Sequence, residues 1–210
     1  MRLRAANAQV AAAKAVVART QADLAREREL RQRKGMGNYL VTMAESDALE
    51  AGIRLKIAEN ETVADPAARL QENTRLLLDL ARCSLARELE VLEVQRAMHR
   101  KAVISKEELS IAESRARLAA IKVKLAEAAT VPDAPARRLE MARLEVEVCQ
   151  EQVRLMLNSL DHIQQLHQQR AAANSELEAA RLELSIAKTR LMLADLEYAQ
   201  MQRDKPAGAK

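Results

Sequence analysis

Apolar residues recur at alternating spacings of three and four along most of the chain, which is the period of an amphipathic α-helix. Proline, glycine and short polar segments interrupt this pattern. The pattern predicts an all-α fold with helices near residues 3–34, 38–61, 67–101, 105–129, 136–170 and 174–203. The third helix is longer than the fourth, so it either overhangs its neighbour or breaks near Cys83 and Ser84.

The segment 105–129 carries two apolar stripes, and these lie about 160° apart when each residue turns the helix by about 100°. Polar strips separate the stripes, with Glu113 and Lys124 in one strip and Arg115 and Lys122 in the other. Such a helix needs a neighbour on each side and water on its two remaining faces, and its seven-residue period predicts left-handed coiled-coil packing. The stripes are Leu109, Ala112, Ala116, Ala119, Val123 and Ala126, and Ile111, Leu118, Ile121 and Leu125.

A unit of 68 residues recurs three times along the chain. Segment 43–59 matches segment 111–127 and, less closely, segment 179–195. The units predict three antiparallel coiled-coil helical hairpins, elongated and laid side by side: repeats at 1–65, 66–133 and 134–203, with a disordered tail at 204–210. Recurring alanines predict a small-residue seam along which helix backbones approach closely, formed by Ala44, Ala51, Ala58, Ala112, Ala119, Ala126, Ala180, Ala187 and Ala194.

Each hairpin has a tip between its two helices. Ser105 followed by Glu108 fits a capping box, and Asn38 and Asn174 are expected to cap the equivalent helices. Basic side chains near the tips, such as Lys106, are either solvated helix ends or contacts for an acidic partner or anionic headgroups. The residues expected to contact a partner at the tips are Gly35, Gly37, Asn38, Lys101, Ile104, Ser105, Arg170 and Asn174.

Composition argues against several classes of function. The chain is 49% hydrophobic but only 1% aromatic, whereas enzyme pockets are usually lined with aromatic groups. No nucleotide-binding or catalytic motif occurs, and His162 and His167 are five residues apart, so they do not share a helix face as a zinc pair would. We therefore expect no catalytic activity, no cofactor and no metal site. Cys83 and Cys149 are expected to be buried free thiols, or a disulfide if separate helices align them.

Charge and hydropathy limit the partners. The net charge of +4 comes with alternating signs, so no basic stripe for nucleic acid is expected. No run of 18 uncharged apolar residues could span a membrane, and any membrane association is expected to be indirect. The acid-free segment 1–22 is an ordinary helix start, or alternatively a transit peptide or a membrane-surface helix.

Two segments resemble the coiled-coil hairpins of bacterial efflux and secretion proteins. Residues 101–128 are similar to the returning helix of HlyD-like periplasmic adaptors, in which a hydrophobic-Ile-Ser tip precedes an acidic capping stretch and alanine heptads. The adaptor tip pattern Arg-x3-Leu-x6-Ser is matched at Ser105 and conservatively at Met98, but Val94 stands in the arginine position. Residues 174–198 look more like a TolC-like outer-membrane efflux protein, whose wall helices have two neighbours and two wet faces.

The resemblance implies a non-catalytic structural component of an efflux or secretion conduit, docking through hairpin tips and forming a helical wall. Its partners would be proteins bound through coiled-coil seams and tips, further copies of the chain among them. It would then lie in the cell envelope or periplasm, as a fragment of an exported protein. The alternative is a cytoplasmic coiled-coil scaffold or membrane-associated spacer, which the lack of a signal peptide in this sequence favours.

Overall fold

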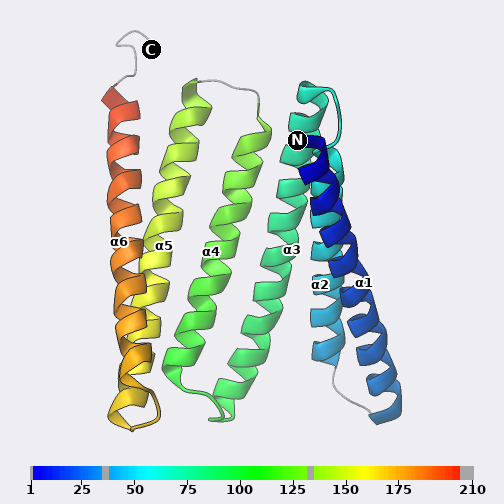
Figure 1. Cartoon of the computed structure of the whole chain (residues 1–210). Coiled ribbons are helices and arrows are strands. Elements are labelled where there is room, and N and C mark those ends of the chain that lie inside the picture. Colours follow the sequence, from blue (N-terminus) through cyan, green and yellow to red (C-terminus); the bar gives the residue numbers. More distant parts are fainter. Residues whose placement is uncertain (1, 35–37, 132–134, 204–210) are drawn as a thin grey trace. The chain divides into compact units, whose positions relative to one another are not determined.

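The computed structural model describes residues 2–34, 38–131 and 135–203, and within these it contains six helices and no strand (Figure 1). The predicted all-α fold is confirmed, and each helix begins and ends within two residues of its predicted position. The predicted tail at 204–210 lies outside the described residues. The helices are α1 (Arg2–Lys34), α2 (Asn38–Asn60), α3 (Pro66–Arg100), α4 (Lys106–Thr130), α5 (Pro135–Gln168) and α6 (Asn174–Arg203).

The chain forms two compact units, Met1–Arg87 and Glu88–Lys210, and the boundary between them falls inside α3. This helix continues through Cys83 and Ser84, so the alternative of a break at these residues is wrong. The predicted repeat boundaries lie elsewhere, after residues 65 and 133, and the division into three repeats stays a prediction.

In the first unit, α1 and α2 run antiparallel. Arg28 of α1 pairs with Glu45 of α2 at 2.8 Å, and Lys14 pairs with Glu59 at 3.8 Å. The lower-numbered residue of α1 thus meets the higher-numbered residue of α2. These exposed ion pairs stabilise little, because water screens them. Ala51, which is 4% exposed, marks the buried side of α2.

The opposite side of α2 packs on the first part of α3, in the same unit. The buried Asn60 side chain donates from Nδ2 to Asn73 Oδ1 at 2.8 Å and to the Arg69 carbonyl at 2.9 Å. Further along, the Cys83 thiol donates to the Ser46 carbonyl at 3.7 Å. Because a buried amide must find its partners, Asn60 favours one register between these helices.

In the second unit, the end of α3 packs on the alanine-rich side of α4. Leu92 of α3 forms a buried cluster with Ala112 and Ala116 of α4, and Leu109 packs against it. Figure 1 shows α4, α5 and α6 running side by side in alternating directions. Helix α5 packs on both α4 and α6. Its buried apolar residues are Ala142, Leu144 and Val146, and those of α6 are Ala180, Leu184 and Ala187.

Local signals set the ends of α3 and α4. Pro66 is the first residue of α3, a position where its missing N–H costs nothing, and Asp65 Oδ1 accepts from the Ala67 N–H at 2.9 Å. The predicted capping box of α4 is confirmed. Ser105 Oγ accepts from the Glu108 N–H, and the Glu108 carboxylate accepts from the Ser105 N–H.

The expected cap of α6 is wrong. Asn174 is already the first residue of the helix, and Ala173 occupies the cap position, from which its carbonyl accepts the first helical hydrogen bonds. Glu176 accepts from the Ala173 N–H at 3.0 Å, which reproduces the glutamate half of the capping box. Asn38 likewise begins α2 as a helical residue.

Candidate functional site

The tip between α3 and α4 is closed by backbone hydrogen bonds. The Val103 N–H donates to the Met98 carbonyl at 3.0 Å, and the Ala102 N–H donates to the His99 carbonyl at 2.9 Å. Ala102 has φ 54°, in the left-handed region. These features form a Schellman motif, in which glycine is the usual left-handed residue.

The tip between α5 and α6 has the same construction. The Ala171 N–H donates to the Leu166 carbonyl at 2.8 Å, the Arg170 N–H donates to the His167 carbonyl at 2.9 Å, and Arg170 has φ 59°. Each of these residues lies 68 positions after its counterpart in the other tip. Alanine and arginine thus occupy a conformation that disfavours side chains, so the rest of each tip must hold it in place.

A histidine braces each of these two tips. His99 Nδ1 lies 3.1 Å from the Ile104 carbonyl, and His167 Nδ1 lies 3.0 Å from the Ala172 carbonyl. A carbonyl oxygen only accepts hydrogen bonds, so in both cases Nδ1 carries the proton. The bond joins the last turn of one helix to the residue before the next helix cap. Neither histidine was among the residues predicted to contact a partner at the tips.

The start of α4 is also tied to α5. Hydrogen bonds from the backbone at Glu107 and from the Gln165 side chain lower the pKa of the Glu107 carboxyl, and His162 adds a weaker attraction. An open polar hollow of about 200 Å³ lies nearby, and it is lined by Lys106, Glu107, Ser110, Asn158 and Asp161. The start of α4 and the Gln165 side chain of α5 therefore lie close together in this unit.

The residues predicted to contact a partner at the tips differ in their solvent exposure. Gly35 and Gly37 lie outside the described residues. Lys101, Arg170 and Asn174 are exposed, as a partner contact requires. Ile104 and Ser105 are half-buried. They stabilise the turn itself, because the Ile104 carbonyl bonds to His99 and Ser105 caps α4.

The predicted seam alanines all lie on described helices, and none of them is exposed. Ala112 is the most buried at 2% exposure, because it packs against Leu92 across the contact between α3 and α4. The buried set is Ala51, Ala112, Ala119, Ala180 and Ala187, and the half-buried set is Ala44, Ala58, Ala126 and Ala194.

A buried polar network between α4 and α5 was missed by the sequence analysis. Ser114 is wholly buried, and its Oγ accepts from Asn158 Nδ2 at 3.1 Å and from Arg117 Nη2 at 3.0 Å. Arg117 Nε donates to Glu151 Oε1 at 2.9 Å, which fixes the antiparallel register of the two helices. The available signal was a serine among apolar residues on one side of α4, but its partner lies 44 residues away.

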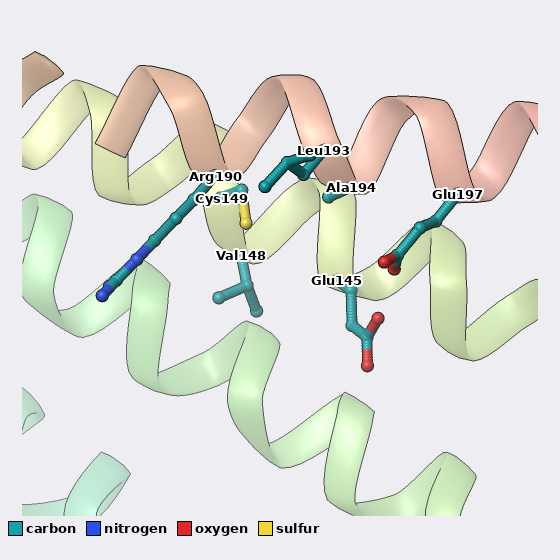
Figure 2. A pocket seen from close by; sticks show the side chains of 7 residues that line it. All are labelled: Glu145, Val148, Cys149, Arg190, Leu193, Ala194 and Glu197. Atoms are coloured by element: carbon teal, nitrogen blue, oxygen red, sulfur yellow. The ribbon is translucent and has the colours of Figure 1, made fainter. Parts of the chain in front are cut away.

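The hollow in Figure 2, of about 250 Å³, lies between α5 and α6. Val148 and Cys149 of α5 and Leu193 of α6 line it. The Glu145 and Arg190 side chains lie toward opposite ends. Burial raises the pKa of the Cys149 thiol, Glu145 raises it further, and Arg190 opposes both. The thiol is therefore protonated near neutral pH, and a protonated thiol is a poor nucleophile.

The Cys83 thiol is also protonated near neutral pH. Burial and the Glu50 carboxylate raise its pKa, and Arg87 opposes them. Both cysteines are free thiols, which leaves no disulfide between them.

Within the described ranges, no three side chains among His, Cys, Asp and Glu gather as metal ligands would. No described helix is both long enough and apolar enough to cross a membrane. No protein-family model, curated protein or solved structure matches the chain.

Proposed function

We propose that the chain is a non-catalytic wall component of a bacterial efflux or secretion conduit. In this proposal its helices form three antiparallel hairpins of one 68-residue repeat, elongated and laid side by side. The tips dock end to end on a partner protein, and the helices line the conduit.

The observation that carries the proposal is the burial pattern of α4. Ala112 and Ala116 are buried on the side toward α3, and Ser114 is buried on the side toward α5. Arg115 and Lys122 between these sides are exposed. A helix with two covered sides and an exposed polar side between them suits a single layer, which can wall a passage, better than the surface of a globule.

The two described tips support end-to-end docking. Each is closed by the same backbone and histidine hydrogen bonds, and each presents an exposed basic residue, Lys101 in one and Arg170 in the other. A rigid end with a basic residue suits a partner surface that carries carboxylates, because little conformational freedom is lost on binding.

Localisation and transport in the source cell test the proposal. We expect the protein in the envelope fraction, and we expect deletion of its gene to lower efflux of toxic small molecules or secretion of an exported protein. Wild type should restore transport, whereas Ala112→Trp should not, because indole cannot fit at a position that is 2% exposed. Ala86→Trp, at an exposed position of α3, is the matched control and should restore it.

A purely cytoplasmic protein whose deletion leaves efflux and secretion unchanged would overturn the proposal and favour the coiled-coil scaffold. Solution scattering tests the layered hairpins separately, because a radius of gyration near the roughly 17 Å of a compact chain of this length would contradict them.

A further inference from the structure

A row of large apolar side chains on α6 is uncovered. Ala180, Leu184 and Ala187 are buried, whereas the side chains of this row are about half exposed, and Leu182 reaches 62%. Ile186 and Leu193 lie at the edge of the row that borders hollows against α5. Exposed apolar residues in one row along a helix mark an interaction surface. The bare α6 face consists of Leu182, Ile186, Leu193 and Leu196.

The matching side of α4 is covered by α5. Ser114, which lies 68 positions before Leu182, is wholly buried and bonds to Asn158. In the other unit, the matching side of α2 meets α3 through Ser46 and Asn60. In both units, therefore, this side of a helix packs on the helix that follows it in the sequence. The positions of α4 that match the bare α6 face are Ser114, Leu118, Leu125 and Ala128, and all four are buried or half-buried.

One side of α1 is also uncovered, and it corresponds to the side of α5 that packs on α4. The α5 residues Glu151 and Asn158 bond to α4, and Leu144, one heptad earlier, is 4% exposed. Residues of α1 correspond to residues of α5 that lie 136 positions later in the sequence. The α1 residues that correspond to Met141, Leu144, Glu151 and Asn158 are all alanines, and all are exposed. The bare α1 face consists of Ala5, Ala8, Ala15 and Ala22.

We propose that the bare α6 face of one copy packs antiparallel on the bare α1 face of a second copy, in the register that joins α4 to α5. Side-chain size identifies the occupant as a second copy. Ser114 faces Asn158 within the chain, and the same register places Leu182 beside Ala22. The larger residue on α6 meets the smaller residue on α1, so the contact keeps close packing.

A second pair follows the same rule. The register set by the bond between Arg117 and Glu151 places Ala128 near Met141, and between copies it places Leu196 near Ala5. The contact joins two different faces, so it is head to tail and produces closed rings or open chains of copies. A second copy of the chain is thus the partner that continues the proposed wall. This rests on the proposed function only in treating α1 and α6 as wall helices.

Sedimentation of the full chain tests the inference. We expect wild type to sediment as several copies of 23.3 kDa and to remain associated in about 1 M salt, because the contact is apolar. Leu182→Glu combined with Leu193→Glu should reduce the mass to that of one copy without loss of helical circular dichroism, since both positions are exposed. Met192→Glu is the matched control, because the corresponding α4 residue, Lys124, is exposed, and it should associate like wild type.

The bare α1 face has its own variant. Ala8→Glu combined with Ala22→Glu should also give single copies, whereas Ala18→Glu, which matches the exposed Arg154, should not. Mixing the α6 variant with the α1 variant leaves one intact face of each kind. We expect the mixture to form a one-to-one dimer of twice 23.3 kDa and nothing larger.

Three results would overturn the inference. Wild type could sediment as a single copy at every concentration tested. The α1 variant could associate by itself, which would show that α6 pairs with α6. The two variants could fail to combine. None of these results bears on envelope location or transport, so the proposed function would stand or fall separately.

Discussion

Replacing Ala112 by leucine tests whether alanine sets the spacing between α3 and α4. Ala112 is 2% exposed and packs in one cluster with Leu92 and Ala116. Leucine adds three carbon atoms at a point that is almost wholly covered by neighbouring side chains. Either the new side chain adopts a strained rotamer, or α4 moves away from α3 and the cluster loses contact.

We expect Ala112→Leu to lower the free energy of unfolding by about 1–3 kcal/mol, the usual cost of an overpacked core position. The equilibrium constant for unfolding then rises about 5- to 150-fold. A chain of this size loses about 2–4 °C in melting temperature for each kcal/mol. Helix propensity contributes little, because alanine and leucine are both strong helix formers.

Urea unfolding followed by helical circular dichroism measures the change, and the slopes with urea must agree between proteins for the free energies to be compared. Ala86→Leu is the matched control, because Ala86 is an exposed residue in the middle of α3. It should stay within about 0.5 kcal/mol of wild type. If Ala112→Leu were as stable as wild type at equal slope, close alanine packing between α3 and α4 would be refuted.

Three further predictions concern the helix ends and the thiols. Ser105→Ala should lower the free energy of unfolding by about 1 kcal/mol in the same urea assay, since it removes the cap of α4, whereas Asn174→Ala should change it by less than about 0.5 kcal/mol. The lowered pKa of Glu107 contributes stability above the ordinary glutamate pKa of about 4.3, and this contribution is lost as the pH falls through the folded pKa. Melting curves of wild type and Glu107→Gln should therefore differ at neutral pH and converge in acid, and a constant difference would contradict this. Cys83 and Cys149 should react slowly with an aromatic disulfide reagent in the folded protein and fast in urea, because burial raises the pKa of both thiols. Equal rates in the two states would refute that cause.

The helices could be predicted because their signals are local. Proline at the starts of α3 and α5 and the three-four spacing of apolar residues place the ends within two residues. The capping box at Ser105 was predictable for the same reason, since both of its bonds span three residues.

The tips and the polar contacts between helices were not predictable in the same way. A glycine would have indicated the residue with left-handed backbone, but Ala102 and Arg170 occupy these positions. The backbone hydrogen bonds that hold them there form only once the tip has folded. Asn174 looked like a cap because asparagine caps well in isolation, yet the turn places Ala173 there instead. Ser114 and Asn158 meet through tertiary packing, so no local pattern in the sequence identifies Asn158 as the partner of Ser114.

The construction of the two described tips separates their shape from their chemistry. The backbone bonds and the histidine brace are the same in both, while the left-handed residue is alanine in one tip and arginine in the other. Substitutions at Ala102 or Arg170 can therefore change the charge and size that a tip presents without altering its path. During evolution, the surface that such a tip presents can change in a single mutational step, while the helices on either side stay as they are.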